Sequence, residues 1–384
     1  MKKRTFIHTS NIIVFLILCW VQVKAFQTEE RYFDTISAKN EALTIAICYP
    51  STGSIRAVMA LMQEGFFPSE DVIIVGCYHE KEITNYRSSQ NYVETNNLDW
   101  FKFHKIIGDI SKDHLFENNA CSDDFKKIFR LSDGIIFFGG ADIPPEIFKE
   151  KTSLLTEIRT PYRHYMELSF VFHLLGGYQN IRYDCYLQTG PDYPVLGICL
   201  GEQTLNVGTG GTLIQDIWFE QYGKTYVEDV IALGKENWHT NPVRRLYPLD
   251  KLTGINYHRI RLVEKSKFGT EMGFTKNDTP YILSSHHQAA KKLGRGMRIA
   301  ATSMDGKIIE AIEHDRFNNV LGIQFHPESP SNYDRQNKIR ITLEDGEGFN
   351  IRTFLENNKP SFEFHEKLWG WFVGIARKYH DSKR

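Results

Sequence analysis

The sequence lacks a surplus of charge of either sign and a membrane-length apolar run. Lysine and arginine number 46 against 47 acidic residues, which gives a formal net charge of −1. A protein without a basic excess has little electrostatic attraction for a phosphate backbone, so nucleic acid is not an expected partner. The apolar run from Ile12 to Val21 is only ten residues long. A spanning helix needs about 20 residues, so we expect no stable membrane span.

The first 25 residues nevertheless have their own pattern. Residues 2–4 are basic, the apolar run Ile12 to Val21 follows, and Val23-Lys24-Ala25 offers a cleavage position. This three-part order is typical of a secretory signal peptide. We therefore expect export to the periplasm or the extracellular space, cleavage near Ala25, and a mature domain over residues 26–384. A membrane anchor or a lipid-modified Cys19 are the alternatives, but Ile17-Leu18 before that cysteine lacks the small residues expected there.

Cysteine is scarce, and no C-x-x-C motif occurs, so neither a zinc nor a redox site is expected. Without the leader, five cysteines remain, and an odd number in an exported protein leaves at least one thiol unpaired. Cys48 and Cys77 lie in strand-like runs and should be buried. Cys121 and Cys185 lie in polar segments, and the sequence leaves their pairing open.

Short, continuous apolar runs are present and alternate with helical patterns. Strands are predicted over residues 42–48, 72–77, 134–138 and 195–198, with an amphipathic helix over 55–64. Unbroken apolar strands are typical of a parallel sheet that is covered on both faces. The predicted fold is therefore α/β, a doubly wound and mostly parallel sheet flanked by helices, in a single domain. Residues 365–379 should form a helix that docks on this domain, and residues 80–119, 176–193 and 331–360 are interpreted as insertions.

The clearest chemical motif is Gly197-Ile198-Cys199-Leu200-Gly201, which follows a strand-like run. A nucleophile on a sharp strand-to-helix turn has an unfavourable backbone, and side chains two residues away on either side would collide with it. The partly positive end of the following helix favours the thiolate, and the N–H of Leu200 faces the position of an oxyanion. Cys199 is therefore the candidate nucleophile, although the motif alone also fits a tight turn with a buried cysteine.

Two further motifs also follow predicted strands. His326 and Glu328 come directly after residues 320–323. A histidine there can take the thiol proton, while the carboxylate holds the imidazole in the useful tautomer. The Gly139-Gly140 pair ends another strand and lets a backbone N–H approach a ligand, which makes Gly140 a candidate second oxyanion donor. Each feature alone is more often an ordinary loop.

Together, these motifs resemble the class I glutamine amidotransferase superfamily, specifically its gamma-glutamyl hydrolase branch, peptidase family C26. The likeness runs from about Thr44 to Glu328. It is carried by Phe138–Asp142, Leu196–Leu213, Ser284–Gln288 and Gly322–Glu328, and by Arg163 and Glu167, which look like the branch's R-D-x-x-E stretch.

The resemblance implies that Cys199, His326 and Glu328 form a triad that cleaves a small gamma-glutamyl compound through a thioester, without a cofactor. It also implies that the substrate is bound by residues of two matching segments, with Gln203, Ser284, His286, His287 and Gln288 as candidates. Neighbouring residues in an extended segment point to opposite sides, so the pair His286-His287 is not expected to hold a metal.

Three positions depart from the family pattern and bear on substrate identity. Leu200, Glu202 and His164 stand where the branch usually carries Arg, Met and Asp. Three alternative functions stay open at this point. They are a catalytically silent binding protein of the same fold, a glutaminase subunit that supplies ammonia to a synthase, and a cysteine peptidase for larger gamma-linked peptides. The leaving amine and the oligomeric state are also open.

Overall fold

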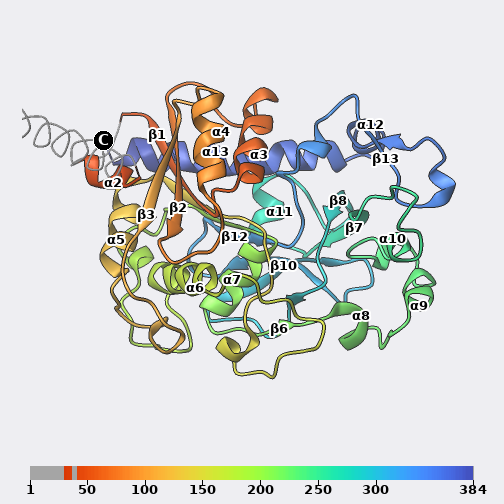
Figure 1. Ribbon diagram of the computed structural model, residues 1–384, viewed down its shortest axis with the longest axis horizontal. Coiled ribbons are helices and arrows are strands. Elements are labelled where there is room, and N and C mark those ends of the chain that lie inside the picture. Colours follow the sequence, from red (N-terminus) through yellow and green to blue (C-terminus); the bar gives the residue numbers. More distant parts are fainter. Residues whose placement is uncertain (1–29, 37–40, 384) are drawn as a thin grey trace, which may run out of the picture.

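The computed structural model describes residues 30–36 and 41–383, so the signal peptide expected over residues 1–25 lies outside the described residues. A ten-stranded sheet runs through the molecule in the order β3-β2-β1-β4-β5-β12-β11-β10-β7-β8 (Figure 1). Its first six strands are mutually parallel. They are β3 (Phe101–Ile106), β2 (Val72–His79), β1 (Leu43–Cys48), β4 (Gly134–Phe137), β5 (Val195–Ile198) and β12 (Val320–Ile323).

Beyond β12 the sheet continues with antiparallel strands that the sequence analysis did not identify. They are β11 (Ile309–His314), β10 (Met297–Ser303), β7 (Asn256–Leu262) and β8 (Tyr281–Ser284). Polar residues interrupt the apolar runs of β7 and β11. Arg261 of β7 is exposed between buried neighbours, and Glu310 of β11 is buried between apolar residues. The predicted mostly parallel sheet is confirmed, with this extension added.

Helices cover both faces of the parallel strands, as a doubly wound fold requires. On β1, Ile45 and Ile47 face one apolar cluster and Ala46 and Cys48 face the other, because successive strand residues point to opposite sides. The first face is covered by α3 (Thr52–Gln63) and by the long helix α13 (Ser361–Ser382). The second is covered by α5 (Ser122–Leu131), α6 (Pro161–Leu175) and α7 (Leu200–Gly208). The docking helix predicted over residues 365–379 is thus confirmed as part of α13.

The interpretation of residues 80–119 as an insertion is wrong in part. This segment contains α4 (Arg87–Thr95) and the parallel edge strand β3. Lys102 and Lys105 of β3 are only partly buried, while the other four residues of the strand are buried. An edge strand has only one neighbouring strand, so it tolerates such polar positions, and they interrupt the apolar run on which the prediction relied.

Short elements gather at the far end of the sheet, around β7 and β8 (Figure 1). A third apolar cluster there includes Trp218, Trp238, Tyr257 and Leu355. The segment over 331–360, interpreted as an insertion on the same domain, therefore shares a core with residues near 217–257. The elements of this end are α8 (Ile217–Glu220), α9 (Val227–Ile231), α10 (Val243–Leu246), α12 (Ile351–Asn357) and the pair β13 (Lys338–Ile339) and β14 (Phe349–Asn350).

The remaining described elements are short. They are α2 (Tyr32–Thr35), α11 (Lys267–Glu271) and the pair β6 (Leu213–Ile214) and β9 (Ala289–Ala290). The five cysteines within the described residues are all buried free thiols, so Cys121 and Cys185 form no disulfide in this structure. No helix within residues 30–36 and 41–383 combines the length and the apolarity needed to cross a membrane.

Parallel strands bring the segments that follow them to one edge of the sheet. Strands β1, β4, β5 and β12 are consecutive neighbours. The residues after their carboxyl ends are Tyr49, Phe138, Cys199 and Gln324. In open α/β sheets this edge is where ligands bind, and the predicted chemical motifs lie there.

Candidate active site

Cys199 occupies the turn between β5 and α7 and has a strained backbone. Its φ of 54° and ψ of −105° lie in a region that residues other than glycine rarely adopt. The two flanking positions have no room for a side chain, so both must be glycine. A Cβ at Gly197 would lie 2.5 Å from the carbonyl carbon of Gly201, and one at Gly201 would collide with the carbonyl oxygen of Phe137. The predicted nucleophile elbow is therefore present in the structure.

His326 and Glu328 are joined by a hydrogen bond. Nδ1 of His326 donates to Oε1 of Glu328 at 2.7 Å, which leaves Nε2 as the nitrogen that can exchange a proton with a substrate or a thiol. A Cβ placed on Gly139 would lie 3.0 Å from Cε1 of His326 and 3.4 Å from Cβ of Cys199. The three segments that follow β4, β5 and β12 therefore converge at Gly139.

The loop that carries His326 is held from two directions. The N–H of His326 donates to the carbonyl of Leu283 on β8 at 2.9 Å, and Asn332 donates to the carbonyl of His326 at 2.9 Å. The carbonyl of Pro327 accepts from Tyr333 and from Trp369 of α13. These bonds fix the direction of the imidazole before any substrate arrives.

The charge state of His326 follows from its neighbours. Burial alone lowers the pKa of an imidazole, but the charges of Glu328 and Cys199 and the hydrogen bonds to them outweigh burial and raise the pKa of His326 well above its ordinary value. A raised pKa of the histidine is what a thiolate–imidazolium pair requires.

Gly140 and Leu200 approach each other on the other side of Cys199. Leu200 is the first residue of α7, so its N–H is one of those without a partner inside the helix. A Cβ on Gly140 would lie 3.0 Å from Cδ2 of Leu200 and would collide with Nη1 of Arg163. The geometry is compatible with both residues donating N–H groups to one oxyanion, and this assignment stays a prediction.

Arg163 forms a buried scaffold under this turn. Its Nη2 donates to the carbonyls of Phe138 at 2.7 Å and Gly139 at 3.1 Å, and its Nε donates to Glu167 at 2.7 Å. The guanidinium also lies 3.7 Å from the ring centre of Tyr49, whose φ of 66° is itself strained. The side chains that resemble the R-D-x-x-E stretch thus support the Gly139-Gly140 turn from inside the protein.

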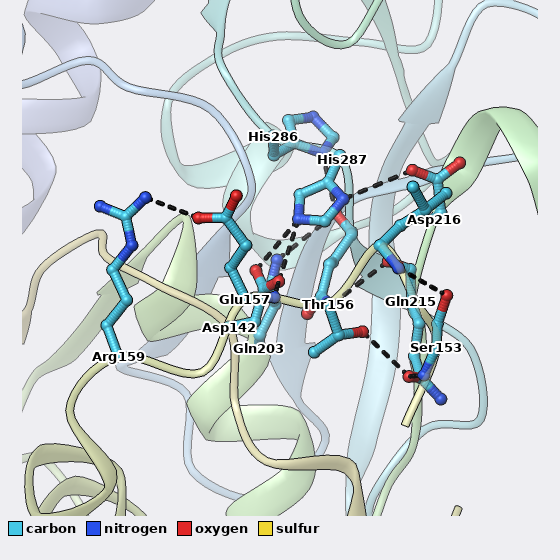
Figure 2. Close-up of polar contacts among 12 residues, drawn as sticks. Asp142, Ser153, Thr156, Glu157, Arg159, Gln203, Gln215, Asp216, His286 and His287 are labelled. Carbon is cyan, nitrogen blue, oxygen red and sulfur yellow. Dashed lines mark hydrogen bonds and ion pairs between the residues drawn. The ribbon is translucent and has the colours of Figure 1, made fainter. Parts of the chain in front are cut away.

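A pocket of about 680 Å³ opens beside Gly140, and its lining includes Asp142, Asp216, Arg245 and His287. Nε2 of His287 lies 3.1 Å from both carboxylate oxygens of Asp142, and Nδ1 lies 3.4 Å from Asp216 (Figure 2). Burial lowers the pKa of His287, but the bonds to the two carboxylates outweigh this and raise it to about 9. His287 is therefore an imidazolium shared between two carboxylates.

A second pocket, of about 340 Å³, lies beside the first. Its lining includes Gly139, His326 and Glu328, and it shares Tyr49 and Ser285 with the first pocket. Accessible space therefore adjoins the Gly139-Gly140 turn and the pair of His326 and Glu328.

The substrate-binding candidates occupy different environments. His286 and His287 point to opposite sides, as predicted, with His287 in the open pocket and His286 buried. Ser284 donates to the carbonyl of His239, Gln288 donates to the carbonyl of Gln215, and Gln203 donates to Gln324. These last three side chains are buried and bond within the protein, and their part in substrate binding stays a prediction.

The family departures near the nucleophile are also internal. Leu200 and Glu202 are buried at 1% and 0% exposure. Burial, with a smaller contribution from Glu310, raises the pKa of Glu202 well above its ordinary value. The carboxyl group is therefore neutral and does not place a charge in either pocket.

Sequence reasoning missed several pocket residues. Tyr49 could have been found as the residue that follows the parallel strand β1. Asp142 and Ser285 belong to two of the segments that carry the family resemblance, although the sequence assigned neither of them a role. Asp216 had no comparable signal, because only the fold brings it to the pocket.

Comparisons with known proteins agree with this geometry. The family model described as Peptidase C26 matches residues 115–328, which includes all the predicted reactive residues. A glutamine amidotransferase-like protein of Rickettsia prowazekii is 30% identical over 242 residues, which cover 58% of this chain and 78% of that protein. Another from Lactococcus lactis is 28% identical over 208 residues, which cover 54% of this chain and 70% of that protein.

Among solved structures, a glutamine amidotransferase from Methylobacillus flagellatus aligns with 79% of this chain and 94% of its own. The TM-score is 0.37 and the sequence identity is 12%.

Proposed function

The chain belongs to the peptidase C26 family, and we propose that it is a cysteine-dependent hydrolase that cleaves a gamma-glutamyl amide through a thioester on Cys199. One observation carries this proposal. The nucleophile elbow and the hydrogen-bonded pair of His326 and Glu328 both lie against Gly139. A thiol, a base and a group that orients the base are the elements that nucleophilic amide hydrolysis requires.

In the proposed first half-reaction, the Cys199 thiolate attacks the amide carbonyl carbon, and the N–H groups of Leu200 and Gly140 stabilise the oxyanion. His326, as imidazolium, then gives its Nε2 proton to the departing amine. The C–N bond breaks and a thioester remains on Cys199. Glu328 keeps the Nδ1 proton in place throughout, since it accepts that hydrogen bond.

In the second half-reaction, the neutral His326 takes a proton from water, and the resulting hydroxide attacks the thioester carbonyl. The C–S bond breaks, the carboxylic acid product leaves, and Cys199 departs as thiolate beside an imidazolium. Atoms and charge balance without a cofactor or an oxidant. The raised pKa of His326 supports this resting state.

The charged residues of the larger pocket support the proposal that this pocket binds the amino-acid end of the substrate. Asp142 and Asp216 carry two negative charges against the single positive charge of His287. The remaining negative charge suits an ammonium group. Arg245 lines the same pocket and suits a carboxylate. A glutamyl group presents both charges at one end and its side-chain amide at the other.

The proposal is tested by supplying the purified protein with a panel of matched compounds. The panel contains glutamine, gamma-glutamyl dipeptides and gamma-glutamyl-aminobutyrate, with alpha-linked isomers as controls. We expect release of glutamate from gamma-linked compounds only, and a transient mass increase of one glutamyl group on the protein after rapid acid quenching. Cys199→Ala should abolish both signals, while Cys121→Ala should keep them. Cleavage of alpha-linked isomers at equal rates, or turnover by Cys199→Ala, would contradict the proposal.

We also propose that the protein is exported, with the leader removed near Ala25. This rests on the sequence of residues 2–25 alone.

A further inference from the structure

A group of three histidines and one glutamate lies in the interior, away from the proposed reactive residues. His239 follows the short helix η4 (Lys235–Asn237), His258 is on β7, His286 follows β8, and Glu310 is on β11. All four residues are at most 5% exposed. One side-chain nitrogen or oxygen from each lies within 4.8 Å of the others.

The separations within this group are close to those of a coordination shell. Oε1 of Glu310 lies 3.1 Å from Nδ1 of His239 and 3.8 Å from Nε2 of His258, and Oε2 lies 3.7 Å from Nε2 of His286. Ligand bonds of about 2.0–2.1 Å in a tetrahedral site place neighbouring ligand atoms about 3.3 Å apart. The three separations that involve Glu310 are near this value, and side-chain rotations that shorten the widest separation, at most 4.8 Å, would bring all four ligand atoms to one ion.

The four side chains are not held together by hydrogen bonds to one another. The facing atoms of all four side chains are buried and have no hydrogen-bond partner. Nδ1 of His239 and Oε1 of Glu310 are within hydrogen-bond distance, yet the ring N–H does not point at the oxygen. Buried polar atoms without partners are costly and rare in native proteins, so four such side chains that converge on one point are typical of a ligand-binding site.

The outer nitrogens of two histidines fix the tautomers that a metal needs. Nδ1 of His286 lies 2.9 Å from the carbonyl of Gln288, and Nδ1 of His258 lies 3.1 Å from the carbonyl of Arg259. A carbonyl only accepts, so each Nδ1 carries the proton and each inward Nε2 presents a lone pair. A ring N–H bonded to a backbone carbonyl is the usual outer support of a metal-bound histidine.

The composition of the group points in the same direction. Within the described residues, the side chain of Glu310 is buried and its ion-pair contacts are all with histidines. A buried carboxylate normally has an opposite charge beside it, and a divalent cation among these imidazoles would provide one.

We propose that His239, His258, His286 and Glu310 form a structural binding site for a divalent transition metal, with Zn²⁺ as the best match. Three imidazoles and one carboxylate are ligands that this ion accepts, and four protein ligands complete a tetrahedral shell without an open position. The ion would connect β7, β11 and the segments that contain His239 and His286. Since His287 follows His286 directly, the ion would also hold His287 in the neighbouring pocket. The proposal does not depend on the proposed hydrolase function.

The test uses the full chain in the Cys199→Ala background, because a thiolate beside a histidine can itself bind zinc. Metal content of the purified protein is measured by elemental mass spectrometry, followed by removal with a chelator and return of Zn²⁺ or Co²⁺ alone. We expect close to one metal ion per chain, a rise in Tm when Zn²⁺ is returned, and visible absorption typical of tetrahedral Co²⁺.

Matched variants locate the site. Glu310→Gln and His258→Gln keep side-chain volume and should lose the metal and the Tm response, whereas His173→Gln changes an equally buried histidine elsewhere and should keep both. If the first two variants fail to fold, the chelation and return experiment on the parent chain still decides. Absence of bound metal together with an unchanged Tm on adding Zn²⁺ would overturn the proposal and leave a buried imidazolium–carboxylate network. Full metal retention in Glu310→Gln and His258→Gln would overturn it as well.

Discussion

Nη2 of the buried Arg163 donates to the backbone carbonyl of Phe138 at 2.7 Å, directly before the turn that carries Gly140. The same nitrogen reaches the carbonyl of Gly139 at 3.1 Å. An arginine four residues before Glu167 on α6 therefore sets the path of a turn on β4, and with it the direction of the N–H of Gly140. We therefore expect the buried pair to act on the proposed reaction through the backbone of this turn.

Arg163→Lys should lower kcat more than it changes KM. Lysine keeps the positive charge but has a single amine, so it cannot donate to both carbonyls and Glu167 in the same plane. A small displacement of a group that stabilises the transition state costs about 10²-fold. Steady-state kinetics on the best gamma-glutamyl substrate measures this, with a thermal melt to show that the variant is folded. Glu167→Gln, which changes the partner of Arg163, is measured in the same way. If the two variants lose activity only as far as their Tm falls, the role of the pair is purely structural.

Gly140→Ala should reduce activity, while Gly370→Ala should not. A Cβ at Gly140 would collide with Nη1 of Arg163, whereas one at Gly370 on α13 would meet nothing within 4 Å. We expect about 10²-fold lower kcat for the first variant. The second should be stabilised by roughly 0.5–1 kcal/mol, because alanine loses less conformational freedom in a helix than glycine does. Both variants are compared with the parent protein in kcat and in the denaturant concentration at the unfolding midpoint. Normal turnover in Gly140→Ala would exclude this turn from the site.

His326→Ala, Glu328→Gln and the double variant should show that the two residues act as a unit. Loss of a positioned acid or base typically costs about 10²–10⁴-fold. Since Glu328 acts by holding Nδ1 of His326, the double variant should be scarcely slower than His326→Ala alone. The values of kcat/KM for the three proteins test this. If the two losses multiply, or if His326→Ala stays near normal, the triad is wrong and His287 is the next base to examine.

The ion pairs of His287 should make stability depend on pH. Its pKa in the folded protein is about 9, against about 6.5 in an unfolded chain. A raised pKa stabilises the folded state fully below about pH 6.5, and this contribution is lost as pH rises through about 9. The difference in Tm between the parent protein and His287→Gln should therefore be largest near pH 6 and small above pH 9. A difference in Tm that does not depend on pH would contradict the assignment.

Removal of the leader should produce a mature chain that begins near Phe26. Mass spectrometry of protein recovered from the periplasm or medium of an expressing cell measures the first residue. A full-length chain that retains Met1 and accumulates in the cytoplasm would show that residues 2–25 have another purpose.

The parts of the predicted reactive centre are local in the sequence. The elbow at Cys199 depends on Gly197 and Gly201, within two residues, and the contact of His326 with Glu328 spans two residues. The parallel strands around them could also be predicted, because strands that are buried on both faces are continuous runs of apolar residues. The parallel half of the sheet and the order of its motifs thus followed from short stretches of sequence.

Elements that are partly exposed were harder to predict. Strand β3 was hidden by Lys102 and Lys105, and β7 contains Arg259 and Arg261 among its buried residues. In the sequence, strands with polar residues resemble loops, because the neighbouring strands that stabilise them come from distant parts of the chain.

Long-range placement of side chains was decided only by the tertiary structure. His286 was assessed from the sequence beside His287 alone, and the alternation of an extended segment correctly separated the two. That local rule contained no information on His239, His258 and Glu310, which the strand order around β7, β8 and β11 brings to the inward side of His286. Asp142 and Asp216 likewise meet His287 from opposite sides although 74 positions separate them in the chain. Backbone hydrogen bonding and the burial of apolar residues determine where such strands and loops lie, and the polar side chains they carry are brought together as a consequence.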